Sequence, residues 1–571
     1  MNNFFKVLMA ISVLIFGLSA CDSSTESREK NEKIDGAKSG GLYKMSLSDD
    51  ILSIFPHNLV DADAFNLMNQ VYEGLLSLDE KANSIRPELA ESYSISDDGL
   101  IYTFKLKEGV FFHDDQVFKD GMGREVMASD VVYCFKKLCE PSENNAMYPY
   151  VLDLIKGASE HYNALVNKEF TPDLPEGLRV IDEKTLEIEL VQATPNFLAV
   201  LTHPCCWIFP RELYDYSGDI NSWCVGTGPF KARTIKMNEV VILERNEHYH
   251  KADSAGNALP YLDAVRCNFI EDENQQLDEF LSGNLDMIFR LPRNKIKRLQ
   301  ERSSKGNTNY EVLTIPGMRV EYYGFQHRTK PFDNANVRRA INFAIDREFL
   351  ADSVLDGFGE PAIFGFVPPS TPGYNSEKIA GYEFNPEKAA QLLKEAGYED
   401  LKDFPVLTVQ INDGNPTALE VAEAIQDMLF ESLGLTVELS ILPRDKHYEE
   451  IENGTVAIWR DGWIADYPDP ENFLRLFYGK LVPDDSVKAS YLNTVRFKND
   501  TFDGFFELSM REGDQTERLE LLREADSVMM QEAAVAPLYY EQWVWLLSNR
   551  VENLSYSPMG ELDLTRVYFA N

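Results

Sequence analysis

The sequence predicts a mixed fold of the α/β or α+β class, because strand-like and helix-like periodicities intermix from one end of the chain to the other. Residues 100–106 and 185–191 alternate apolar and polar side chains, as half-buried strands do. Residues 337–345 instead carry an apolar stripe with helical spacing. The chain has 571 residues, several times the usual domain length of about 100–200 residues, so we expect at least two lobes.

Turn and cap residues indicate where the elements begin. A tight turn, Gly226-Thr227-Gly228-Pro229, leads into an expected hairpin, and Asp333 or Asn334 is the expected N-cap of the helix that follows. Asn385 and Pro386 are typical N-cap and N1 residues. The expected elements are a hairpin at 230–235 and 240–245, and helices near 337–345, 386–396, 418–432 and 517–532.

The first residues predict an export signal. Lys6 supplies a positive charge, and residues 7–18 form an apolar run shorter than the roughly 20 residues that span a bilayer. The run ends in Leu18-Ser19-Ala20-Cys21, which resembles the lipobox of bacterial lipoproteins; an ordinary signal peptide before a cysteine is the alternative. We expect residues 1–20 to be a lipoprotein signal peptide, Cys21 to carry the lipid, and residues 21–41 to be a flexible tether.

Acidic residues strongly outnumber basic ones. The chain has 93 Asp and Glu against 55 Lys and Arg, a net charge of −38. Such a surface repels phosphate backbones, so nucleic acid is not an expected partner. Net charge reports on solubility and gives no information about the ligand.

Six cysteines remain after Cys21, and their spacing does not decide their redox state. Export permits disulfides, but six cysteines allow fifteen pairings and none of them forms a CxxC pair. Buried thiols and disulfides both stay open. The six are Cys134, Cys139, Cys205, Cys206, Cys224 and Cys267.

Several short segments that occur in one order along the chain are similar to segments of the family 5 extracellular solute-binding proteins. That family includes the oligopeptide- and dipeptide-binding proteins of ABC importers. The resemblance extends from about Leu42 to the C-terminus, and most of its motifs have a structural reason; Arg338 and Arg339, for example, are expected on a solvated helix face. The segments are QVYEGLL (70–76), PELAES (87–92), DDGLIYTFKL (97–106), GVFFHD (109–114), ASDVVY (128–133), GTGPF (226–230), ERN (244–246), VRRAINFAIDR (337–347) and APLYY (536–540).

The resemblance implies a two-lobed, periplasmic-binding-protein-like fold of type II with an extra inserted domain. Ligand would be enclosed between lobes that close about a hinge, and a peptide would lie extended with its backbone paired to protein strands. The implied division is a discontinuous lobe I (42–75, 197–305 and 547–571), an inserted domain II (76–196) and a lobe II (306–546).

The resemblance also points to residues 458–473 as the ligand segment. In the oligopeptide-binding proteins a similar Gly-Trp-x-Ala-Asp-Tyr run supplies the carboxylate that pairs with the α-amino group of the peptide, which by position is Asp466. A counter-charge is physically reasonable, because enclosing an unpaired ammonium is costly. The alternative is that Asp466 only caps the turn around Pro468 and Pro470.

Further candidate ligand residues follow from the same resemblance. Arg460 matches a position that can meet the carboxylate end of a peptide, although an ion pair with Asp461 or another acid is equally expected. Trp463 matches a pocket wall or is plain core, and Gly462 and Ile464 would offer backbone groups. From lobe I, the matching segment is Val60-Asp61-Ala62-Asp63.

Other functions are less well supported by the residues. The chain has no Gly-x-Ser-x-Gly elbow and no His-Glu-x-x-His motif, so an exported hydrolase is not favoured and no catalytic residue is assigned. His248 and His250 flank one residue but are not expected to bind a metal, and no cofactor is expected. In this chain the family's usual Pro-x-Tyr-Trp ending is replaced by Glu247-His248-Tyr249-His250, and its Leu-Asp-Pro turn by Ile54-Phe55-Pro56.

The expected function is therefore solute binding rather than catalysis. The protein would be a monomer that captures short peptides on the extracytoplasmic face of a membrane and delivers them to the permease and ATPase subunits of an ABC importer. Oligosaccharides, nickel chelates or haem are the alternative solutes within the family. The retained Asp466 favours a ligand that carries an amine.

Replacing the expected lipid-bearing cysteine tests the membrane attachment. Cys21→Ala removes the thiol that would accept the diacylglyceryl group, so the protein should move from the membrane fraction to the soluble fraction on cell fractionation. A Cys139→Ala variant should stay with the membrane. Recovery of Cys21→Ala in the membrane fraction would contradict lipidation at this residue.

Overall fold

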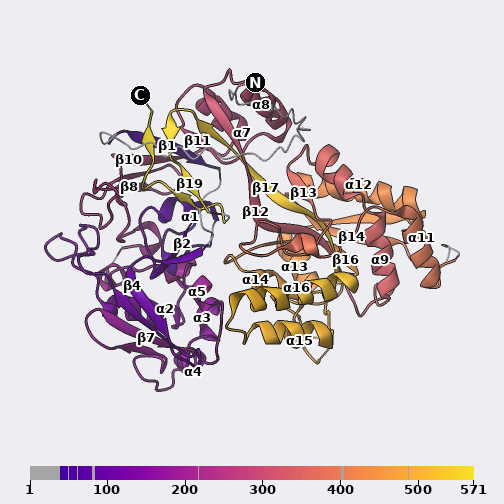
Figure 1. Ribbon diagram of the computed structural model, residues 1–571, viewed down its shortest axis with the longest axis horizontal. Coiled ribbons are helices and arrows are strands. Elements are labelled where there is room, and N and C mark those ends of the chain that lie inside the picture. Colours follow the sequence, from indigo (N-terminus) through magenta and orange to yellow (C-terminus); the bar gives the residue numbers. More distant parts are fainter. Residues whose placement is uncertain are drawn as a thin grey trace, which may run out of the picture. The chain divides into compact units, whose positions relative to one another are not determined.

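The computed structural model describes residues 39–570 apart from 49–50, 61, 80–83, 217, 400, 402–403, 486–487 and 558. The expected signal peptide, Cys21 and the tether up to residue 38 lie outside the described residues. Helices and strands intermix through the described chain, which confirms the mixed α/β class (Figure 1). Among the described residues, no helix combines the length and the apolar content that a bilayer crossing requires.

One eleven-stranded sheet extends through the molecule, and the edge strand β13 (Gly359–Pro361) pairs with β17 beside it. Its pairing is mixed: β1 lies parallel to β10 and β11, whereas β12, β16 and β17 are antiparallel. In spatial order the strands are β15 (Val437–Leu442), β14 (Leu407–Asn412), β16 (Ile458–Ile464), β12 (Tyr310–Phe325), β17 (Val535–Ser548), β11 (Met287–Ile288), β1 (Leu42–Leu47), β10 (Ala264–Phe269), β9 (Val240–Arg245) and β8 (Phe230–Lys236).

The two longest strands, β12 and β17, carry residues of four hydrophobic clusters, two on each side of an irregularity in their pairing. Ile315 packs into the core around β1, β9 and β10. Val320 and Tyr322, a few residues further along β12, pack into a second core with Phe473. The register between β12 and β17 shifts between Pro316 and Val320, so the change of core coincides with an irregularity in the pairing.

A separate four-stranded antiparallel sheet confirms two strands that the sequence predicts. Its order is β4 (Ala90–Ile95), β5 (Ile101–Leu106), β7 (Thr185–Glu189) and β6 (Leu178–Val180). Buried and half-buried residues alternate along β5 and β7, as expected for strands with one face on the core. The helix α2 (Ala128–Leu138) contacts β6 and β7. The hairpin expected after the Gly226–Pro229 turn is also present as β8 and β9.

Four expected helices are confirmed as α9 (Ala335–Ala344), α11 (Pro386–Glu395), α12 (Pro416–Leu433) and α16 (Gln515–Gln531). Asn334 rather than Asp333 caps α9, and Asn385 caps α11. One expectation is wrong: Arg338 does not lie on a solvated face. It is 4% exposed and donates to the carbonyl oxygens of Phe332 and Ala533, because α9 packs against the chain that leads into β17.

The remaining elements are short. They are the helices α1 (Ala62–Met68), α3 (Pro149–Leu152), α4 (Ala158–Val166), α5 (Phe197–Val200), α6 (Arg211–Asp215), α7 (Glu273–Leu281), α8 (Arg293–Ser304), α10 (Arg347–Phe349), α13 (Arg444–Glu452), α14 (Pro470–Leu474) and α15 (Asp500–Ser509), and the strands β2 (Leu76–Asp79), β3 (Ser84–Pro87), β18 (Val551–Glu552), β19 (Ser555–Tyr556), β20 (Leu562–Asp563) and β21 (Tyr568–Phe569).

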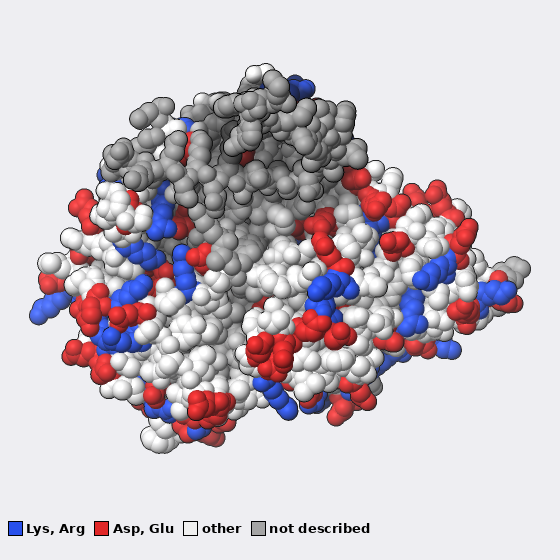
Figure 2. Space-filling model, in the orientation of Figure 1, with Lys and Arg blue, Asp and Glu red and all other residues white. Residues whose placement is uncertain are grey.

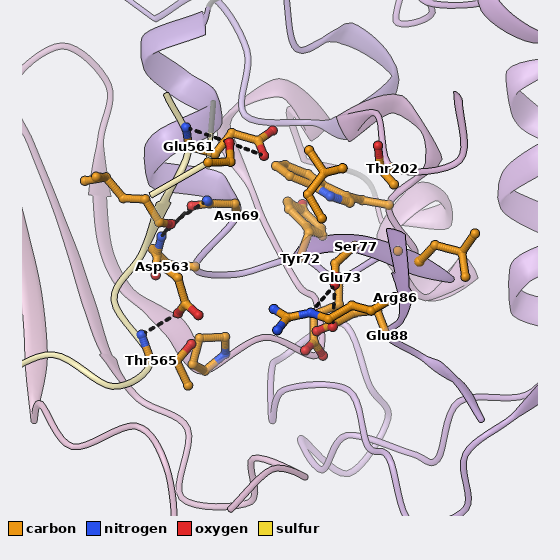
Figure 3. A pocket seen from close by; sticks show the side chains of 18 of the residues that line it. Asn69, Tyr72, Glu73, Ser77, Arg86, Glu88, Thr202, Glu561, Asp563 and Thr565 are labelled. Atoms are coloured by element: carbon orange, nitrogen blue, oxygen red, sulfur yellow. Dashed lines mark hydrogen bonds between the residues drawn. The ribbon is translucent and has the colours of Figure 1, made fainter. Parts of the chain in front are cut away.

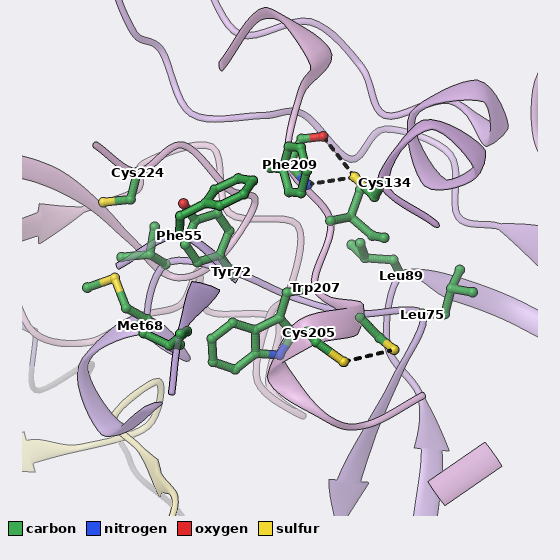
Figure 4. Packing of buried hydrophobic residues seen from close by; sticks show 14 of the residues in the cluster. Phe55, Met68, Tyr72, Leu75, Leu89, Cys134, Cys205, Trp207, Phe209 and Cys224 are labelled. Atoms are coloured by element: carbon green, nitrogen blue, oxygen red, sulfur yellow. Dashed lines mark hydrogen bonds between the residues drawn. The ribbon is translucent and has the colours of Figure 1, made fainter. Parts of the chain in front are cut away.

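The six cysteines are buried, and the described part of the chain contains no disulfide bond. Cys134, Cys205 and Cys224 lie in the core around Tyr72 and Trp207, whose rings stack with centroids 6.0 Å apart (Figure 4). The Cys134 thiol donates to the Phe209 carbonyl oxygen at 3.3 Å. Burial raises the pKa of Cys224 to about 12. Between the two open possibilities, these cysteines are buried thiols that pack as small apolar side chains.

Gly226 allows two distant segments to meet. A Cβ atom at this position would lie 2.1 Å from the carbonyl oxygen of Val71, a backbone atom that cannot move aside easily. In the same turn, the Gly228 N–H donates to the Val71 oxygen at 2.9 Å. The His113 N–H donates to the Gly226 oxygen, also at 2.9 Å. The motif thus joins the start of β8 to the segment after α1.

Gly226→Ala should destabilise the protein by about 2 kcal/mol, because it forces a methyl group into a close backbone contact. Chemical denaturation of a soluble form of the protein that begins at Asp22 would measure this loss of stability. Gly513→Ala is the matched control, since no atom lies within 4 Å of the added Cβ there. Equal unfolding midpoints for the two variants would contradict this account of Gly226.

Candidate functional site

Beyond Trp459, no described strand pairs with one edge of β16. The other edge of β16 pairs with β12. The Ala465 N–H donates to the Met318 oxygen and the Gln326 N–H to the Ala457 oxygen, each at 2.9 Å. These two bonds show which residues of β16 direct their backbone groups to β12. In an antiparallel pair, alternate residues direct their backbone groups away from the partner strand. By this alternation Arg460, Gly462 and Ile464 point their N–H and C=O groups to the opposite edge.

On that opposite edge, β14 covers β16 only as far as Trp459. The Arg460 oxygen then receives a hydrogen bond from His447 Nε2 at 3.1 Å, and the Gly462 N–H donates to Asp461 Oδ1 at 2.8 Å. Burial lowers the pKa of His447 to about 4, so its ring is neutral at pH 7. Ile464 is 48% exposed at the end of the edge.

Arg460 is held in an ion pair with a residue that sequence reasoning did not single out. Its Nη2 lies 2.5 Å from Glu321 Oε2 on β12, and its Nη1 donates to Asn412 Oδ1 on β14 at 3.2 Å. Arg460 is 7% exposed and Glu321 2% exposed. The sequence left two roles open for Arg460, binding a ligand carboxylate or pairing with an acid of the protein. The structure contains an ion pair, and the acid is Glu321 rather than Asp461.

Asp466 lies immediately after β16, where Asn472 organises the chain. Asn472 Oδ1 accepts from the indole N–H of Trp463 at 2.8 Å and from the Asp466 N–H at 3.1 Å. Its amide group donates to Asp466 Oδ2 at 3.0 Å. The cap of the following helix α14 is Asp469, which accepts from the Glu471 N–H at 2.9 Å. Asp466 is half-buried, and Asn472 helps to fix its carboxylate in position.

The loop after β16 also contacts the short helix α5 from a distant part of the chain (Figure 1). Asn196, which precedes α5, donates to Glu471 Oε2 at 2.7 Å and to the Tyr467 hydroxyl at 3.2 Å. Burial raises the pKa of Glu471 above its usual range. Ala199 and Val200 pack against Tyr467. Glu471 lies within the expected ligand segment 458–473, but no sequence pattern indicates its pairing with Asn196, because this contact depends on the tertiary fold.

The lobe I segment of the expected site is described only in part. Val60 is 48% exposed, and α1 begins two residues later at Ala62. Asp61 lies outside the described residues, as do the side chains of Ala62 and Asp63.

A small pocket, partly open to solvent, lies elsewhere; Asn69, Glu73 and Glu88 line it together with Glu561 and Asp563 of the C-terminal segment (Figure 3). Tyr72 and Trp207 line it together with charged side chains, and none of the expected ligand residues does. In Figure 3, Asn69, Glu561 and Asp563 face Glu73, Arg86 and Glu88 across the pocket.

A buried cluster around Glu73 forms one wall of this pocket. The Glu73 carboxylate accepts from the Thr227 hydroxyl at 2.8 Å and from the Tyr249 hydroxyl at 3.0 Å. His250 Nε2 lies 2.9 Å and Lys251 Nζ 3.3 Å from the same carboxylate. Burial opposes ionisation of Glu73, but Lys251 and His250 outweigh it and hold its pKa well below the usual range.

This chain has Glu247-His248-Tyr249-His250 where the family usually has Pro-x-Tyr-Trp. The difference has a structural consequence, because His250 pairs with Glu73. His248, by contrast, is exposed. Within the described residues, no three His, Cys, Asp or Glu side chains come together as a metal site would require.

Acidic and basic side chains are interspersed over the face of the molecule that Figure 2 shows. On this face the basic residues do not gather into a continuous tract of the kind that tracks a phosphate backbone.

Comparisons with known proteins agree with the geometry of the sheet. The model of the bacterial extracellular solute-binding proteins, family 5 Middle, matches residues 84–483. The oligopeptide-binding protein OppA of Bacillus subtilis is 28% identical over 578 residues and covers 98% of each chain. Heme-binding protein A of Haemophilus influenzae is 28% identical over 565 residues and covers 97% of each chain.

Solved structures share the fold over nearly the whole chain. The periplasmic binding protein DppA from Helicobacter pylori, in complex with the peptide STSA, aligns with a TM-score of 0.72 and 25% identity over 93% of this chain and 99% of that chain. HbpA2 from Haemophilus parasuis aligns with a TM-score of 0.76 and 24% identity over 93% of this chain and 100% of that chain. The family match and the shared two-lobed fold lead to one conclusion: this chain belongs to the family 5 bacterial extracellular solute-binding proteins.

Proposed function

We propose that this protein binds short peptides in an extended conformation and delivers them to an ABC importer. The observation that carries the proposal is the edge of β16 over residues 460–464, which ends next to the Asp466 carboxylate. An extended peptide gains main-chain hydrogen bonds by adding to such an edge, and a carboxylate at its end suits the peptide's ammonium group. Solute binding, and no catalytic step, is the activity this arrangement supports.

The related proteins favour peptide over the other solutes. The name of the Bacillus relative refers to oligopeptides, and the Helicobacter pylori structure contains a tetrapeptide. Glutathione-binding protein GsiB of Escherichia coli, 26% identical over 517 residues, is named for a peptide-like solute. The name of Heme-binding protein A makes haem an alternative ligand to peptide. Oligosaccharides and nickel chelates are further alternative ligands. The amine-binding chemistry of Asp466 favours peptide among these.

The ligand residues that we propose come from both lobes. Arg460, Gly462, Trp463, Ile464 and Asp466 would line the site from lobe II. The segment Val60-Asp61-Ala62-Asp63 would face them from lobe I.

The long strands β12 and β17 connect the lobes that we propose, because they contribute to hydrophobic clusters of both. Lobe I comprises residues 42–75, 197–305 and 547–571, domain II residues 76–196, and lobe II residues 306–546. The change of core within β12, near Pro316–Val320, supports a hinge in that stretch of the β12–β17 pair. A hinge there would let the lobes close on a ligand without breaking either core.

The partners that we propose are the permease and ATPase subunits of the importer, with the protein acting as a monomer held at the membrane surface by lipid on Cys21. The soluble form beginning at Asp22 provides the direct test. Native mass spectrometry of this form, purified without denaturation, should detect co-purifying short peptides. A sugar, a haem or a metal chelate as the bound species would overturn the peptide assignment while leaving the family unchanged.

Asp466→Asn should weaken peptide binding at least tenfold, a loss of about 1.4 kcal/mol, because the ammonium group loses its counter-charge. Calorimetry with a peptide found in the native complex would measure the affinity. The melting temperature of the empty protein should stay nearly unchanged, since Asn472 can still hydrogen-bond an amide oxygen. Asp97→Asn, at an exposed turn, is the control. An unchanged affinity of Asp466→Asn would remove this residue from the site.

We propose that the contact between Asn196 and Glu471 belongs to the ligand-bound, closed form. Asn196→Ala should then weaken peptide binding about tenfold, because that form loses a hydrogen bond to the buried Glu471 carboxylate. The dissociation rate, measured by stopped-flow fluorescence, should rise. Asn284→Ala is the matched control: Asn284 also donates to a glutamate, Glu279 at 2.7 Å, but on the surface of one local turn. Equal dissociation rates for Asn196→Ala and the wild type would show that this contact between domain II and lobe II does not hold the ligand in place.

A further inference from the structure

Four charged side chains beside the open edge of β16 form a continuous network. Arg460 contacts Glu321 Oε2 at 2.5 Å, and the other oxygen of Glu321 accepts from Arg319 Nη2 at 2.6 Å and from its Nε at 2.9 Å. Arg319 Nε also lies 2.8 Å from Glu541 Oε2 on β17. The order Arg460–Glu321–Arg319–Glu541 contains two cations and two anions, so the network is neutral when all four are ionised.

The backbone beside the network is built to accommodate Glu321. In the β12–β16 register Glu321 lies opposite Gly462, and a Cβ atom at Gly462 would be 2.4 Å from Glu321 Oε1. The carboxylate therefore occupies the space that any other residue at 462 would fill. Arg460 and Gly462, two residues apart, share one face of β16, so Glu321 reaches Arg460 diagonally across the strand pair.

Further charged groups near this edge include three acids, Asp461, Asp466 and Glu471, and the cation Arg475. Asp461 points to the opposite face of β16, where its carboxylate accepts from the Tyr322 hydroxyl at 3.2 Å as well as from the Gly462 N–H. Asp466 and Glu471 follow along the chain. Arg475, the exposed cation closest in sequence, follows Glu471 by one helical turn, at the end of the edge where Asp466 lies.

We propose that Glu321 is a specificity-determining residue: by holding Arg460, it prevents the site from recognising the carboxylate end of a ligand. The inference rests on the proposed peptide-binding function and deepens it. The site then recognises a peptide by its backbone and its amino end only. The ligand class that follows is peptides whose affinity does not depend on a free C-terminal carboxylate, and thus depends little on length.

Three synthetic libraries of tripeptides to hexapeptides test this inference on the wild-type soluble protein. One library has free amino and carboxyl ends, the second has C-terminal amides, and the third has acetylated amino ends with free carboxyl ends. The protein should retain the acid and amide libraries within twofold of each other, measured as bound peptide by mass spectrometry. A tenfold or greater preference for the free acids would overturn the proposal without involving any variant.

The acetylated library separates this inference from the proposed function. Loss of the acetylated peptides, with acids and amides retained equally, is the expected result. Equal retention of all three libraries would remove the amine-binding role of Asp466 but keep the inference about the carboxyl end. Retention of no library would overturn the peptide assignment, and this inference with it.

Glu321→Gln then tests which residue is responsible. It changes the net charge of the network from zero to +1 at Arg460, so the variant should gain at least a fivefold preference for acids over amides. Glu541→Gln is the matched control, since it removes the same charge at the far end and leaves Glu321 on Arg460; its acid-to-amide ratio should stay near that of the wild type. An equal gain in both variants, or a gain in neither, would overturn the role of Glu321.

Discussion

β12 and β17 pair along most of their length, from Tyr310 opposite Ser548 at one end to Gly324 opposite Val535 at the other. All the other strands of the large sheet attach to this antiparallel ribbon. β16, β14 and β15 extend it from the side of β12, and β11, β1, β10, β9 and β8 extend it from the side of β17. Four hydrophobic clusters therefore share one backbone ladder, and the parts of the sheet on either side of the ribbon depend on it for their innermost strands.

The register of the ribbon also determines the chemistry of the site. Because β16 is aligned on β12, Glu321 falls opposite Gly462 and Arg460 falls two residues away on the same face. The same alignment turns the backbone groups of Arg460, Gly462 and Ile464 to the edge that β14 leaves uncovered. A slip of one residue would turn Arg460 to the other face of β16, away from Glu321. It would also turn the backbone groups of Arg460, Gly462 and Ile464 toward β12. The open edge and the charge network therefore depend on the same register.

The candidate site combines a strand edge with charges that are mostly neutralised within the protein. Arg460, Arg319, Glu321 and Glu541 neutralise one another, and Asp469 pairs with the buried Arg518 through two contacts of 2.8 Å. Asn472 holds the Asp466 carboxylate at 3.0 Å. The site that we propose would recognise the backbone common to all peptides and one terminal group, which suits a protein that captures many sequences. The contact of Asn196 with Glu471 adds a polar connection between the segment before α5 and the loop after β16.

Much of the fold could be predicted from the sequence, because it depends on local patterns. The alternation in β5 and β7, the cap residues Asn334 and Asn385, and the turn before β8 all follow from neighbours within a few positions. The position of Asp466 at the end of a strand is likewise readable from its Gly-Trp-x-Ala-Asp-Tyr context. The family resemblance places these elements in order along the chain.

Other features depend on residues far apart in the sequence. Arg338 has the spacing of a surface residue, yet it is buried because the chain before β17 packs on α9. Arg460 has the chemistry of a carboxylate binder, yet Glu321, 139 residues earlier, occupies it. Likewise, Glu73 and His250 are 177 residues apart. The sequence by itself determined the elements and the segment that holds the site, because both depend on local order; only the tertiary structure decided which charges meet, because ion pairs depend on strand register and packing.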